Sequence, residues 1–163
     1  MKNLDITDNL DNIKLDYKYE IKGDSLHDFP TILLGQYQFF KSRLENTNIE
    51  KDCKEIKDKI LKNEGNNNKN ENVGKELEQI IAEYISIKEE AEKEYYYYLK
   101  ILYRISSSYH KKKSGDKVKE AKDIFMKISK ELVDINIRSF INKEKRIILL
   151  IDKIKDFQKL LYI

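Results

Sequence analysis

The sequence is poor in the residues that chains use to turn, to cross-link or to cross a membrane. It has five glycines, one proline, one cysteine and no tryptophan among 163 residues. Because glycine and proline make most tight turns, their scarcity favours a few long helices. The single cysteine, Cys53, excludes an intrachain disulfide and suits a reducing compartment. The longest apolar run lies between Arg146 and Ile151, far short of the roughly 18 residues that span a bilayer, so we predict no membrane span.

Residue sets that carry catalysis or hold metals are missing as well. The two histidines, His27 and His110, stand in unrelated contexts, and no CxxC or HxxxH spacing occurs. The sequence has no glycine-rich phosphate loop and no GxSxG motif. We therefore predict a protein that is not an enzyme, with no metal site and no cofactor.

Charges are abundant but nearly balanced. Thirty-two basic residues face 29 acidic ones, for a net charge of +3. Such a balance is typical of solvated helix faces held by ion pairs, and we predict no nucleic-acid partner. The first 13 residues are acidic and lack an apolar core, so we expect no secretory signal and a protein that is not secreted.

The N-terminal part is predicted to be an arm followed by helices. Residues 15–21 alternate apolar and polar side chains, which indicates an extended arm docked on helices or on another protein. Asp28 and Pro30 can open a helix that runs to about residue 45.

A second apolar series, Ile49 to Ile60, contains Cys53, which we interpret as a small core residue. Residues 63–74 are rich in asparagine and have almost nothing apolar to bury, so they are predicted to be a flexible insertion between residues 1–62 and 75–163.

The region after residue 75 shows the strongest helical period. Ten side chains step by three or four and form one apolar seam: Leu77, Ile80, Tyr84, Ile87, Ala91, Tyr95, Tyr98, Leu102, Ile105 and Tyr109. Tyr96 and Tyr97 flank the seam, so the tyrosine run is predicted to be core with amphipathic edges.

Two further series follow: Val118 to Ile135, and Phe140 to Leu161. Because the phase slips between them, we predict a helix boundary near Asp134. Residues 75–163 would then be a three-helix bundle, and the chain as a whole an all-α antiparallel bundle of long amphipathic, coiled-coil-like helices with a short extended arm.

The triplet Leu102-Tyr103-Arg104, followed by an inward Phe125 and by the segment from Asn136 to Ile151, resembles the LYR-motif family of three-helix mitochondrial adaptors. The resemblance covers residues 95–161. It implies an adaptor that binds an acyl carrier protein, takes its acyl chain into the bundle, and joins it to a larger mitochondrial complex. Besides the triplet and Phe125, the implied partner-binding residues are basic: Lys111, Lys112, Lys113, Lys145 and Arg146.

Two other interpretations stay open. The segment from Asn136 to Phe157 is also similar to the heptad region of vesicle SNAREs, with Lys143 at the central layer. The general alternative is a structural helical subunit of a multiprotein complex, held by coiled-coil contacts. The location is mitochondrial under the LYR interpretation and cytoplasmic otherwise.

Overall fold

The protein is an elongated bundle with three sides. The computed structural model describes residues 28–62, 67–111 and 117–161, with side chains described for 29–62, 72–107 and 119–160. Four helices make up nearly all of these residues: α2 (Asp28–Glu45), α3 (Ile49–Lys62), α4 (Asn67–Lys111) and α5 (Lys117–Leu161). The described residues contain no strand. The predicted all-α antiparallel bundle is therefore confirmed, whereas the predicted arm at residues 15–21 lies outside the described residues.

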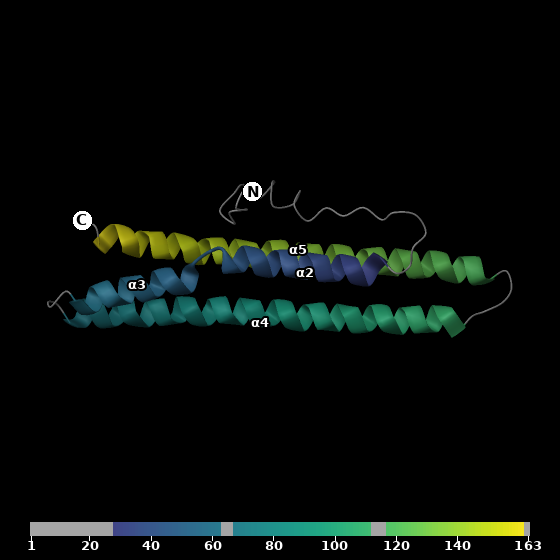
Figure 1. Cartoon of the computed structure of the whole chain (residues 1–163), viewed down its shortest axis with the longest axis horizontal. Coiled ribbons are helices and arrows are strands. Elements are labelled where there is room, and N and C mark those ends of the chain that lie inside the picture. The colour runs from purple at the N-terminus through teal and green to yellow at the C-terminus, as the bar shows by residue number, and fades with distance from the viewer. Residues whose placement is uncertain (1–27, 63–66, 112–116, 162–163) are drawn as a thin grey trace.

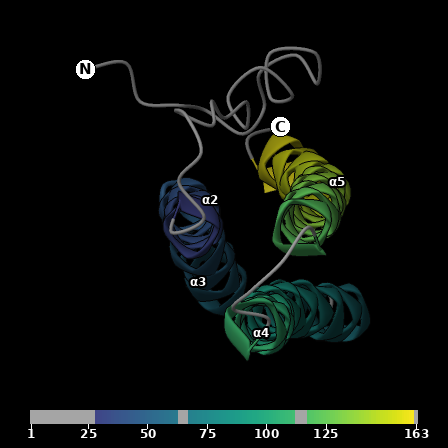
Figure 2. The ribbon, with the colours of Figure 1, turned by 90° about the vertical axis from the view of Figure 1, so that its right-hand side faces the viewer.

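The two long helices lie antiparallel, and the two short ones complete the bundle. Each long helix has 45 residues, which corresponds to a length of about 67 Å. α2 and α3 follow each other along the pair, parallel to α5 and antiparallel to α4 (Figure 1). Seen along the axis, α2 with α3, α4 and α5 form the corners of a triangle (Figure 2).

The joint between α2 and α3 lets the chain continue in nearly the same direction. Asn48 adopts a left-handed conformation (φ 56°), which asparagine tolerates better than most residues, and α3 begins at the next residue. The Thr47 hydroxyl donates a hydrogen bond to the carbonyl oxygen of Leu44 at 2.7 Å. The Tyr84 hydroxyl of α4 donates to the same carbonyl at 3.0 Å. The last turn of α2 is thus satisfied locally and fixed to α4.

Two apolar clusters fill the inside. The larger one joins α3 and the C-terminal end of α2 to the N-terminal part of α4 and the C-terminal half of α5. It includes Cys53, which confirms the prediction that this residue is core. The smaller one joins Phe29 and Leu33 of α2 to Leu102 and Phe125. Leu102 and Phe125 therefore face one core, as predicted. The α4 seam is confirmed for its described side chains, which are buried or partly buried from Leu77 to Ile105.

The predicted boundary near Asp134 is wrong, because α5 is continuous through this residue. The buried face passes through Ser129, Val133 and Asn136, each 0% exposed. Ile128 and Ile135, which we placed on the apolar series, are 37% and 39% exposed. Polar residues occupy core positions in this part of α5. A pattern drawn through the apolar residues alone therefore shows a break in the helical period that the helix does not have.

The predicted division of the chain also needs correction. α4 begins at Asn67, so residues 67–74 of the predicted flexible insertion are helical, while residues 63–66 lie outside the described residues. Between residues 75 and 161, the described residues form two long helices where we predicted three. The third side of the bundle comes from α2 and α3, so residues 28–62 are part of the same folded unit and not an extension.

Candidate protein-binding surface

Two buried polar contacts set the position of α2 against α5. The Asn136 side-chain amide donates a hydrogen bond to Gln36 Oε1 at 3.4 Å. Two turns further along α2, Arg43 Nε donates to Glu144 Oε1 at 2.7 Å, with exposed fractions of 1% and 0%. The Arg43 guanidinium also lies over the Phe39 ring, 5.4 Å from its centroid. Paired polar groups in a core favour one register, because any slip of the helices leaves them without partners.

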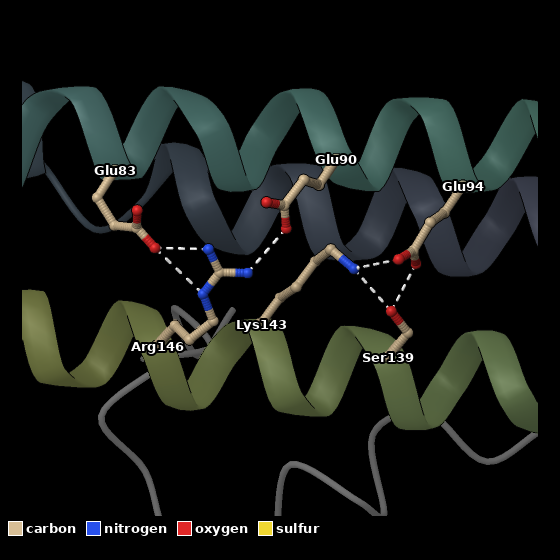
Figure 3. Close-up of polar contacts among 6 residues, drawn as sticks. All are labelled: Glu83, Glu90, Glu94, Ser139, Lys143 and Arg146. Carbon is tan, nitrogen blue, oxygen red and sulfur yellow. Dashed lines mark hydrogen bonds and ion pairs between the residues drawn. The ribbon is translucent and has the colours of Figure 1, made fainter.

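On the opposite side of α5, Arg146 connects α5 to two carboxylates of α4. Its Nε and Nη2 atoms donate to Glu83 Oε1 at 3.2 and 2.5 Å, and its Nη1 atom donates to Glu90 Oε2 at 2.8 Å (Figure 3). Glu83 and Glu90 are seven residues apart and share one face of α4. The hydrogen bond from Arg146 holds the pKa of Glu90 below its ordinary value, and the hydrogen bonds from Glu90 and Glu83 raise the pKa of Arg146.

A second polar cluster lies one to two turns away on the same seam. Lys143 Nζ lies 2.8 Å from Glu94 Oε1 and donates to Ser139 Oγ at 2.6 Å, while Ser139 donates to Glu94 Oε2 at 2.5 Å (Figure 3). The Lys143 side chain is 5% exposed, so its stem packs between the helices. Together the two clusters fasten α4 to α5 on the side that faces away from α2, which lies behind them in Figure 3.

The outer side of the α4–α5 seam, called here the open face, is hollowed and partly apolar. One groove of about 740 Å³ has a floor of Ile80, Leu150 and Phe157, with Leu149 and Arg146 on its α5 wall. A second groove of about 410 Å³ continues along the seam past Arg146 to Asn142 and Ile135. Leu149 is 62% exposed and Ile135 is 39% exposed. Exposed apolar side chains beside a groove with charged walls are the usual anatomy of a protein-binding surface.

A further surface on the solvent side of α4 combines basic and aromatic side chains, and it adjoins the open face because Tyr97 and Arg104 continue the row of Glu83 and Glu90 at intervals of seven. Six exposed residues at a spacing of three or four form this basic–aromatic stripe: Lys93, Tyr96, Tyr97, Lys100, Tyr103 and Arg104. Tyr96, Tyr97 and Tyr103 are 53%, 62% and 59% exposed. Burial raises the pKa of Tyr95 and of Tyr98, which point inward as predicted.

The predicted site residues are divided between the core and these surfaces. Leu102 and Phe125 lie in the core, and Tyr103 and Arg104 lie on the basic–aromatic stripe. Lys145 is exposed on α5, while Arg146 is held by Glu83 and Glu90. Arg104 lies 14 residues beyond Glu90 on α4, about 21 Å along the helix, so the structure does not bring Arg104 and Arg146 together.

The lysines after the triplet are not part of the described surface. Lys111 is the last residue of α4, and its side chain lies outside the described set, as do Lys112 and Lys113 altogether.

Sequence reasoning missed the carboxylates of the open face. A signal was present in the sequence, because Glu76, Glu83 and Glu90 repeat at intervals of seven within a helix whose seam was predicted. Arg146, the partner of Glu83 and Glu90, could not be paired with them from the sequence, since α4 and α5 meet only in the folded chain. Ile135 was missed because it was placed in the core.

Comparisons with known proteins return no match to a family model, to a curated protein or to a solved structure. Within the described residues, no group of three or more histidine, cysteine, aspartate or glutamate side chains is placed to hold a metal ion. In the same part of the chain, no helix is both long enough and apolar enough to cross a membrane.

Proposed function

We propose that this protein is a non-enzymatic helical subunit of a larger assembly, and that it binds a protein partner along the open face. The observation that carries the proposal is the exposure of Ile135 and Leu149 beside two grooves on one side of the α4–α5 seam. Burial of such side chains favours association by about 25 cal/mol for each Å² of apolar surface removed from water.

The shape of the open face suits a helix as the occupant. It is a long, shallow groove between the antiparallel helices α4 and α5, with an apolar floor and ion pairs along its length. Amphipathic helices of a partner that pack on such a face bury their apolar stripes against its apolar floor and meet its charged walls with their polar edges. The occupied face would then resemble one side of a four-helix bundle.

The test is capture of partners from a native extract by the purified chain, followed by quantitative mass spectrometry. Ile135→Asn and Leu149→Asn each place a polar amide in the apolar part of the face, so both should reduce captured partner at least about tenfold if these side chains are central to the contact. Leu61→Asn is the matched control, because Leu61 is 74% exposed on α3, away from the open face. Capture that is equal for all three variants would contradict the proposal.

A second candidate is the LYR-like adaptor, which the basic–aromatic stripe favours. Tyr103 and Arg104 are exposed beside Lys100, where they could meet an acidic carrier protein. Entry of an acyl chain at this end would require Phe29 and Phe125, whose ring centroids are 6.3 Å apart, to separate. This candidate carries with it the mitochondrial location.

The same capture experiment separates the two candidates. An acyl carrier protein should co-purify under the LYR-like proposal, and added salt should weaken the complex. Arg104→Ala should reduce its capture more than Lys93→Ala, because a guanidinium can form paired hydrogen bonds to a carboxylate. If no carrier protein is captured while Leu149→Asn still removes other partners, the open-face proposal holds and the LYR-like one does not.

A further inference from the structure

We infer that the partner on the open face is a second copy of this chain, related to the first by a twofold axis. This inference rests on the proposed function and names its partner. In a twofold interface one surface meets itself, so every contact must occur twice with exchanged roles. A face suited to this carries complementary side chains at equal distances on either side of the axis.

The α4 half of the face has this property in its charges. Two residues of the basic–aromatic stripe, Tyr97 and Arg104, continue the row of Glu83 and Glu90 at the same interval of seven, along the α4 edge of the open face. In an antiparallel copy Glu83 comes opposite Arg104, and Glu90 comes opposite the Tyr97 hydroxyl. Both pairs share one midpoint, between Lys93 and Glu94. Parallel pairing would instead place Glu83 and Glu90 against their own copies, which is unfavourable.

The α5 half has the same property about its own midpoint, Asn142. Ile135 and Leu149 lie seven residues on either side of Asn142, so each apolar side chain meets the other across the axis. Glu131 and Lys153 are both exposed and lie 11 residues on either side, so acid meets base. Asn142 itself is exposed and would meet its own copy, and a side-chain amide has both the donor and the acceptor for this.

The two midpoints lie at one place in the structure, which a single axis requires. Glu94 contacts Lys143, the residue after Asn142, at 2.8 Å. Ser139, which lies three residues before Asn142, donates to Glu94 as well. The centre of the charge pattern on α4 is therefore next to the centre of the pattern on α5 (Figure 3). Nothing in the spacing along either helix alone demands this agreement.

One pair in this arrangement is of like charge, since Arg138 comes opposite Arg146. The Arg146 guanidinium is already bound by two carboxylates, Glu83 and Glu90, so this group of three residues carries one net negative charge. Arg138 of the second copy therefore approaches two carboxylates that share a single cation, so the contact is not a simple repulsion between two arginines.

The test uses charge reversal at Glu131 and Lys153, measured by sedimentation equilibrium of the full chain at micromolar concentrations. The wild type should be a dimer. Glu131→Lys and Lys153→Glu should each weaken dimerisation about tenfold or more, because each variant replaces two attractive pairs by two repulsive ones. A mixture of the two variants restores both attractive pairs and should dimerise like the wild type. Lys51→Glu, an exposed reversal on α3, is the control and should leave the dimer unchanged.

Three results would overturn the inference: a monomeric wild type, a dimer insensitive to both reversals, or a mixture that fails to recover. Circular dichroism on every variant separates loss of association from loss of fold. A monomeric wild type whose capture of another protein still depends on Leu149 would leave the proposed function standing and remove only the second copy as the partner.

Discussion

At the scale of single residues, the centre of the bundle contains charges where the sequence pattern led us to expect apolar packing. Arg43 of α2 and Glu144 of α5 are buried, and their side chains lie 2.7 Å apart although the two residues are 101 positions apart in sequence. Removing two ions from water is costly, and their attraction offsets this cost only while both are present. The pair therefore specifies how α2 sits on α5 more than it stabilises the fold.

This reasoning predicts an asymmetry between single and double substitutions. Glu144→Leu alone should lower the free energy of unfolding by about 3–5 kcal/mol, because it leaves the Arg43 charge buried without its carboxylate. Arg43→Met combined with Glu144→Leu should recover most of the loss, since two apolar side chains of similar size fill the space. Urea unfolding of the three proteins measures both values. A single variant as stable as the wild type would show that the pair is not buried in solution.

Cys53 gives a second prediction, on reactivity. Burial raises the pKa of its thiol from 9.0 to about 11, and the residue is 1% exposed. Because the thiolate is the reactive form, alkylation by iodoacetamide at a pH near 8 should be about 100-fold slower in the folded chain than in urea. Labelling at equal rates in both states would place Cys53 outside the core.

Glu90 gives a prediction on pH. Its pKa is lowered from 4.5 by the hydrogen bond from Arg146, so its contribution to stability is present above this value and is lost as the pH falls through the lower, folded-state pKa. Glu90→Gln should therefore destabilise the protein at neutral pH, and the difference from the wild type should disappear in acid. Thermal unfolding at several pH values measures this. A difference that persists unchanged in acid would mean that the ionised form of Glu90 is not what stabilises the seam.

At the scale of elements, the continuity of α5 is the largest departure from the expected pattern. Ser129, Asn136 and Lys143 lie on the buried side at intervals of seven, together with apolar residues at the intermediate positions. A heptad with a polar residue at one core position is still a heptad, and it forms one helix because its backbone hydrogen bonds do not depend on the polarity of the side chains.

Proline scanning tests this continuity. Asp134→Pro should cost about 3 kcal/mol or more, because it removes a backbone hydrogen bond in a helix interior and its ring clashes with the preceding turn. Lys117→Pro is the control, since the first residue of a helix needs no backbone donor. Equal stability of the two variants would support a boundary near Asp134 after all.

At the scale of the whole molecule, α2 and α3 complete the bundle by packing against both long helices. Without them, α4 and α5 would form only a two-helix hairpin. Phe40 stacks on Phe140 with centroids 4.8 Å apart, and Tyr37 stacks on Tyr95 at the same distance. Both contacts join α2 to one of the long helices. Without α2 and α3, the inner sides of α4 and α5 would face water along most of their length.

Deletion of residues 1–62 should therefore abolish cooperative unfolding and expose apolar surface, seen as binding of a hydrophobic dye. Deletion of residues 1–27 leaves every described helix in place and serves as the comparison. A truncated chain that contains only residues 63–163 and unfolds cooperatively would show that the long hairpin is a domain by itself.

The sequence by itself determined the helical class, the bounds of α2 and α3, and the seam of α4. These features depend on local spacing, and every described position of the α4 seam from Leu77 to Ile105 is apolar or aromatic, so its period could be read without knowing what it packs against. The exposure of Tyr103 and Arg104 follows from the same period.

Only the tertiary structure decided the face of α5 and the location of the grooves. Asn136, Lys143 and Glu144 have side chains that a sequence pattern assigns to water, and they are buried because Gln36, Glu94 and Arg43 reach them from other helices. Each of these three side chains has its partner 49 to 101 residues away along the chain. Which side of the α4–α5 seam stays open depends in turn on where α2 and α3 pack, and no local pattern contains that information.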